Sequence, residues 1–101
     1  MNDKQQIKRI VKLTFHKEHC DQFITFFKES KDKIGNFPGN KGVELLRGKN
    51  TANIFFTFSV WEDESDLELY RQSDLFKSTW SKVKPLFADK PEAWTVINPV
   101  L

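Results

Sequence analysis

The sequence predicts a single α+β domain over residues 1–101, in which four strands form one antiparallel sheet and helical segments follow the order βαββαβ. Three observations carry this prediction. β-Branched and apolar residues typical of strands cluster at 7–15, 43–48, 53–61 and 93–97. Apolar residues at helical spacing occupy the long intervals after the first and third of these clusters. A chain of 101 residues has room for one hydrophobic core and little for a second.

The first predicted strand, residues 7–15, carries apolar side chains on both faces. Val11, Leu13 and Phe15 share one face, and Ile10 lies on the other, which predicts a sheet covered on both sides. Arg9 lies inside this strand between apolar neighbours. Because a charge there needs a partner or contact with water, Arg9 is a candidate to bind an anionic oxygen of a substrate, or to pair with a carboxylate across a dimer.

The next segment, residues 18–34, has helical periodicity. Its apolar stripe consists of Cys20, Phe23, Ile24, Phe27 and Ile34. Gly35-Asn36 is expected to end the helix. Strands at 43–48 and 53–61 are then separated by only four residues, so they are expected to form a hairpin.

The second helical part is expected to be split in two. Asp63 can cap a helix over 64–72, and Ser73-Asp74 begins a second one. Pro85 should break that second helix because proline has no N–H donor. With a last strand at 93–97, the pattern is ferredoxin-like.

The composition excludes several classes of partner. A net charge of +2, with basic and acidic residues interspersed, predicts neither nucleic acid nor an anionic membrane as a partner. No apolar run approaches the roughly 20 residues that a membrane span needs. Cys20 is the only cysteine and the N-terminus is polar without a signal-peptide pattern, so we expect a cytoplasmic protein. Ten Phe, three Trp and one Tyr are many rings for one small core, so some are expected to line a cavity or a subunit interface.

Motifs for several kinds of chemistry are missing. The sequence has no dinucleotide-binding G-x-G-x-x-G, no G-x-S-x-G elbow and no complete phosphate loop. His16, His19 and Cys20 cluster where the first strand meets the first helix, but no carboxylate clearly completes a metal site, so no metal is predicted. The strand at 53–61 lacks the basic residue and glycines of an RNA-recognition motif.

Residues 53–94 contain a series of motifs that together are typical of one family. They are Asn53-Ile-Phe-Phe, Trp61-Glu-Asp-Glu-Ser-Asp-Leu, Tyr70-Arg-Gln-Ser-Asp-Leu-Phe, Trp80 and Lys90-Pro-Glu-Ala-Trp94. This run resembles the antibiotic biosynthesis monooxygenase domains, which include quinol monooxygenases and haem-degrading monooxygenases. The resemblance implies a homodimer whose two sheets close into a barrel, the dimeric α+β barrel, with a pocket between the sheet and helices of each subunit. It also implies oxidation of phenols, anthrones or quinols by O₂ without any cofactor.

Haem degradation is not expected. By matching the Ser-Asp-x-Phe run, the Asn, Trp and His that the haem-degrading relatives use fall at Val11, Tyr70 and Trp80. All three positions depart from that pattern, and a tryptophan cannot ligate iron.

Six residues are candidates for a site. Tyr70 could hydrogen-bond a substrate oxygen or relay a proton, and His16 could act as a general base near neutral pH. Trp61, Trp80 and Phe76 could contact a planar ligand, although the spacing also suits core positions, and Arg9 could bind its anionic oxygen.

The resemblance therefore implies a cofactor-independent monooxygenase that oxidises a small aromatic or quinol substrate with O₂. Two alternatives stay open. One is a non-catalytic dimeric ligand-binding or stress-response protein of the same fold, and the other is an isomerase-type relative.

Overall fold

The computed structural model describes residues 4–101, so residues 1–3 of the polar N-terminal segment lie outside the described part. Its main elements, in chain order, are β1 (Ile7–Thr14), α1 (Cys20–Gly35), β2 (Asn40–Arg47), β3 (Ile54–Trp61), α2 (Glu64–Arg71), α3 (Asp74–Val83) and β4 (Glu92–Val96). Two short 3₁₀ turns, η1 (Lys17–His19) and η2 (Lys84–Leu86), precede α1 and follow α3. The predicted βαββαβ order, with its second helical part split, is confirmed.

The four strands form one antiparallel sheet in the order β2-β3-β1-β4, which is the ferredoxin-like arrangement. β1 lies between β3 and β4, where Ile10 is paired with Phe58 on one side and Trp94 on the other. The predicted hairpin is β2–β3, closed by a hydrogen bond of 2.8 Å from the Gly48 amide to the Ile54 carbonyl. The sheet is therefore made of segments from both ends of the chain.

Element boundaries differ from the predicted ones by more than one residue at two places. β2 begins at Asn40 rather than 43, with an irregularity between Asn40 and Gly42 where the strand pairs with the end of β3. The α-helix begins at Cys20 rather than 18, because the residues before it form the turn η1. Both differences lie at element ends, where local sequence preferences are weakest.

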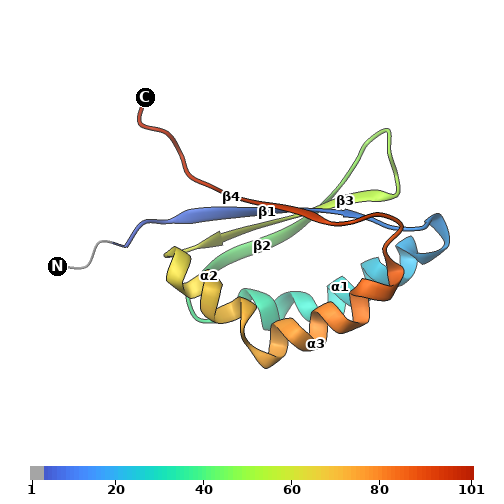
Figure 1. Cartoon of the computed structure of the whole chain (residues 1–101), viewed down its shortest axis with the longest axis horizontal. Helices are drawn as coiled ribbons and strands as arrows, with labels where there is room; N and C mark the ends of the chain where they lie inside the picture. Colours follow the sequence, from blue (N-terminus) through green and yellow to red (C-terminus); the bar gives the residue numbers. More distant parts are fainter. Residues whose placement is uncertain (1–3) are drawn as a thin grey trace.

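All three α-helices lie on one side of the sheet, as Figure 1 shows. Odd-numbered residues of β1 and β3 point to this side, so Leu13, Phe15 and Phe55 join the main core with apolar residues of α1. Phe15 is fully buried, with ring centroids 4.3 Å from Phe23 and 5.7 Å from Phe55. A second core cluster surrounds Trp61 beneath α2.

The other face of the sheet carries an apolar surface that no described element covers (Figure 1). We call it the outer sheet face and define it by six residues that alternate with the core positions: Ile10, Leu46, Phe56, Phe58, Val60 and Trp94. Leu46 and Trp94 are 47% and 45% exposed. The sequence led us to expect cover on both faces, but within residues 4–101 the helices cover only one, because all of them pack against the same side of the sheet.

None of the helices in the described part of the chain has the length and apolar character of a membrane span.

Asp63 caps α2 and connects it to the segment just before β1. Its carboxylate accepts hydrogen bonds from the amide and hydroxyl of Ser65 and from the amide of Gln5. These bonds, those from Ser65 first, lower the pKa of Asp63 from 3.8 to about 2. Since this pKa is lower in the folded state, the stabilisation is present above the unfolded value and is lost as the pH falls through the folded value.

We therefore expect the unfolding free energy of the wild type to fall more steeply between about pH 4 and pH 2 than that of Asp63→Asn. Asparagine still caps the helix but cannot titrate, so the variant isolates the effect of the charge. Urea unfolding at several pH values in this window measures the difference. Identical pH dependence in the two proteins would contradict this role of Asp63.

Candidate functional site

A cavity of about 380 Å³ lies between the helix-covered face of the sheet and the three helices. The sheet contributes residues from all four strands, and α1, α2 and α3 contribute the opposite walls. Arg71 on α2 and Ala93 on β4 both line it and are exposed, which places the opening on the β4 side. The volume lies within the range of pockets that hold small organic molecules.

Aromatic side chains form one continuous wall of this cavity. Tyr70 at the end of α2 lies 5.3 Å from Phe76 on α3, and Phe76 stacks on Trp80 at 5.8 Å with an angle of 10° between the ring planes. α3 exposes Phe76 and Trp80 on one face because they are four residues apart. Behind Tyr70 lies Trp61, with ring centroids 5.1 Å apart. Such a surface suits a planar apolar ligand.

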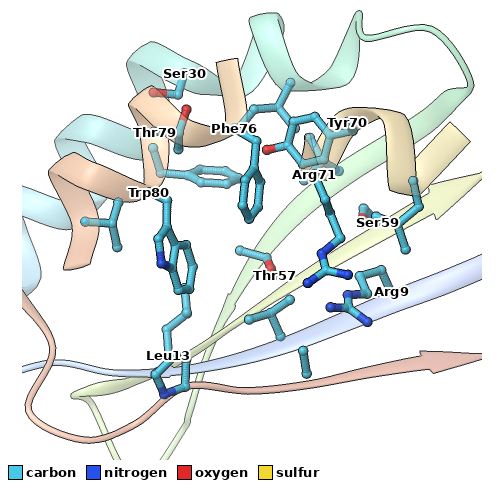
Figure 2. Close-up of a pocket in the computed structure, with 18 of the residues that line it drawn as sticks. Arg9, Leu13, Ser30, Thr57, Ser59, Tyr70, Arg71, Phe76, Thr79 and Trp80 are labelled. Atoms are coloured by element: carbon cyan, nitrogen blue, oxygen red, sulfur yellow. The ribbon is translucent and has the colours of Figure 1, made fainter. Parts of the chain in front are cut away.

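Trp61 is only 1% exposed, and its indole N–H donates to the Ser59 hydroxyl at 3.0 Å. Its polar atom is satisfied inside the protein, and its ring supports Tyr70. Trp61 therefore lies at the cavity wall mainly as a support for Tyr70. The rings of Phe76, Trp80 and Tyr70 face the cavity directly (Figure 2).

The Tyr70 hydroxyl points toward the interior of the cavity in Figure 2. Burial raises the pKa of Tyr70 to about 12, because a phenolate would lose its hydration there. The side chain is therefore an uncharged hydrogen-bond donor at neutral pH. It can donate to a ligand oxygen, but it cannot serve as a general base in its resting form.

Two guanidinium groups lie at another part of the same cavity. Arg9 on β1 and Arg71 at the end of α2 both line it, and their side chains point toward one another in Figure 2. Nη1 of Arg9 donates to the hydroxyl of Thr95 on β4 at 2.8 Å. Nη1 of Arg71 lies 3.4 Å from the carboxylate of Glu68, one turn earlier on α2.

The His16 group lies elsewhere. His16 is exposed in the loop after β1, and neither it nor its neighbours His19 and Cys20 line the cavity. Cys20 is buried, with its thiol 3.6 Å from the His16 carbonyl. Among residues 4–101, no three His, Cys, Asp or Glu side chains form a group that could hold a metal ion. His16 is therefore not part of the candidate site.

Five of the six residues singled out in the sequence thus meet at one cavity. Sequence reasoning missed Arg71 and the hydroxyl groups of Thr57, Ser59 and Thr79, which also line it. A basic residue at the end of a helix is common for electrostatic reasons, so Arg71 carried no distinctive signal. The positions matched to the haem-degrading residues, Val11, Tyr70 and Trp80, all line the cavity as well, and none carries the side chain of that pattern.

Solved structures of several proteins closely resemble this fold. A protein from Nitrosomonas europaea, described as an antibiotic biosynthesis monooxygenase, superposes with a TM-score of 0.86 at 11% identity, over 95% of this chain and 92% of that one. SnoaB from Streptomyces nogalater, a cofactor-independent oxygenase solved as a single-site mutant, superposes with a TM-score of 0.83 at 17% identity, over 95% of both chains. A conserved protein from Methanosarcina mazei Go1 gives a TM-score of 0.85 at 18% identity, over 90% of each chain. At these identities the likeness establishes a shared fold.

No curated protein matches this chain in sequence. A family-level match is nevertheless found: the model of the antibiotic biosynthesis monooxygenases matches residues 6–81. This region includes β1 to β3, α1, α2 and most of α3, and so all the elements that carry Arg9, Tyr70, Arg71, Phe76 and Trp80. The protein therefore belongs to the antibiotic biosynthesis monooxygenase family.

Proposed function

We propose that this protein is a cofactor-independent monooxygenase that oxidises a small aromatic or quinol-type substrate with O₂ in the cavity beside Tyr70. One observation carries the proposal most strongly: an apolar cavity with a wall of aromatic rings contains a single inward-pointing phenol that stays protonated at neutral pH. Membership of the family, and the likeness in fold to a cofactor-independent oxygenase, support the same reaction type.

The chemistry needs little from the protein. An electron-rich substrate anion can reduce O₂ itself; one oxygen atom enters the ring, the other leaves as water, and the substrate supplies the electrons. The protein has to hold the ring, stabilise the anion and exclude water. Phe76 and Trp80 would hold the ring. Tyr70 would donate a hydrogen bond to the substrate oxygen as negative charge develops on it.

We further propose that two copies pair through the outer sheet face, in the manner of the dimeric α+β barrel. The apolar residues of that face lie on the side opposite the cavity, so pairing would leave the helix layer in place. Burial of this face would remove an exposed apolar surface that is costly for a chain of 101 residues. In this account the partners are a second copy and a small aromatic molecule, in the cytoplasm.

A second function, a ligand-binding protein without catalysis, is favoured by one specific feature. Among the described residues that line the cavity, the only groups charged at neutral pH are Arg9, Arg71 and Glu92, and Glu92 lies 3.6 Å from the ammonium group of Lys12. A catalyst would therefore depend on the substrate losing its proton to water, assisted by the positive charges. If no substrate reacts, binding alone would be the function of this cavity.

Oxygen uptake by metal-stripped protein, offered hydroquinones and anthrones, tests the proposal. Uptake is expected above the spontaneous rate, and Tyr70→Phe should lower it by about tenfold to a hundredfold because a transition-state hydrogen bond is lost while the ring remains. Ser81→Ala is the matched control, since it removes an exposed hydroxyl of α3 outside the cavity and should leave the rate unchanged. Equal rates of oxygen uptake in the wild type and in Tyr70→Phe would show that the Tyr70 hydroxyl takes no part in the reaction.

A further inference from the structure

Two positive charges, brought together from β1 and α2, border a cavity whose walls are otherwise mainly apolar. Arg9 and Arg71 converge there from opposite walls, as Figure 2 shows. Burial is the main cause that lowers the pKa of Arg9, and the positive charge of Arg71 is the next. The two like charges thus repel each other, and this repulsion is a cost to the empty protein that an anion between them would relieve.

Neighbouring carboxylates do not occupy that place. Glu64 and Glu68 attract Arg9 electrostatically, but both are exposed on α2, and Glu68 is engaged with Arg71 from the solvent side. Glu92 pairs with Lys12, which is opposite it in the sheet, and the register places both side chains on the face of the sheet away from the cavity.

Most donors of the two guanidiniums are free for a ligand. The described contacts of Arg9 use one of its nitrogens, for the Thr95 hydroxyl, and those of Arg71 use one, for Glu68. A guanidinium has five N–H donors in a planar fork that matches the two oxygens of a carboxylate. The Thr95 bond also fixes the direction of the Arg9 side chain across the sheet.

We propose that the ligand of this cavity is an aromatic carboxylic acid, whose carboxylate binds between Arg9 and Arg71 while its rings pack against Tyr70, Phe76 and Trp80. This inference rests on the proposed ligand site and narrows the substrate class to acids. A neutral quinol would fill the aromatic part and leave the two guanidiniums unpaired. A cavity of about 380 Å³ has room for a fused-ring acid.

The test uses three probes of nearly equal shape: naphthoate, its methyl ester and naphthalene. Binding to the full-length protein is measured by calorimetry at low salt, without any turnover. Naphthoate should bind about tenfold to a hundredfold more tightly than the ester, because charge-assisted hydrogen bonds to the carboxylate are lost on esterification. Added salt should reduce this preference.

The variants Arg9→Gln and Arg71→Gln should each reduce the preference for the acid to less than about threefold, while the affinity for naphthalene stays the same. Arg47→Gln is the matched control, because Arg47 is exposed on β2 over the Phe55 ring and does not line the cavity. Two variants are used because Arg9→Gln, in the middle of the sheet, could disturb folding. Arg71→Gln changes a residue at the protein surface, so it tests the same site with less risk to the fold. Thermal unfolding of each variant confirms that it is folded before binding is measured.

Equal affinity for naphthoate and its ester, or an unchanged preference in both arginine variants, would overturn the inference. Failure of all three probes to bind would overturn it too, together with the ligand site itself. A clear preference for the acid without oxygen uptake from any substrate would support the inference and count against the monooxygenase, so the two proposals can fail separately.

Discussion

Phe58→Glu is expected to convert the proposed dimer to a monomer at micromolar concentration. Phe58 lies in the middle of the outer sheet face, where its backbone is paired with Ile10 on β1 and Glu44 on β2. A carboxylate introduced there would lose its hydration in the dimer and would lie opposite the like charge of Glu44. That should weaken association by about 3–5 kcal/mol, or a factor of roughly a hundred to a few thousand.

Sedimentation velocity or light scattering over a range of concentrations measures the change. Leu69→Glu is the matched control, because Leu69 is an exposed leucine of α2, 64% accessible, on the helix side of the molecule. It makes the same change in charge and should leave the dimer intact. A wild type that is monomeric at micromolar concentration would refute the dimer, and a dimeric Phe58→Glu would show that the chains pair through another surface.

Phe15→Ala is expected to lower the free energy of unfolding by about 3–5 kcal/mol. Phe15 is fully buried where the end of β1 meets α1, and its ring stacks on Phe87 with centroids 5.2 Å apart in addition to its contacts with Phe23 and Phe55. The surrounding rings come from different segments of the chain and cannot all collapse into the space, so most of the cavity created would remain.

Urea unfolding at one fixed protein concentration measures this loss, because the proposed dimerisation would make apparent stability depend on concentration. The control is Leu69→Ala, an exposed position where a change within about 0.5 kcal/mol is expected. A loss below about 1 kcal/mol for Phe15→Ala would mean that this cluster does not hold β1 and α1 together.

The fold could be predicted because each element carries its own periodic signal. β3, with Phe55 and Trp61 on one face and Phe58 on the other, alternates as a strand, and α1 carries its apolar residues on one stripe. The start of β2 could not be predicted in the same way, since Asn40-Lys41-Gly42 has little strand preference and pairs only because the end of β3 lies beside it. The start of β2 therefore depends on its pairing with β3 and not on the local sequence.

Two residues of the candidate site could be singled out from the sequence by their chemistry. Arg9 was identified because a charge stands out in an apolar strand, and Tyr70 because its phenol could hydrogen-bond a substrate oxygen. Arg71 and His16 show the limit: both suit their local positions, and only the three-dimensional packing distinguishes the one that reaches the cavity from the one that faces solvent. Distances between α2 and β1 are not encoded in any local pattern.

The most direct test of the central claim is the fate of isotopically labelled O₂ during turnover by metal-stripped protein. A monooxygenase without cofactors should place one labelled atom in each molecule of oxidised product, as seen by mass spectrometry. Tyr70→Phe should form this labelled product more slowly. A product formed equally well without O₂ would contradict the account and favour the isomerase-type use of this cavity. A product that needs O₂ but carries no label would also contradict it, because O₂ would then be only an electron acceptor.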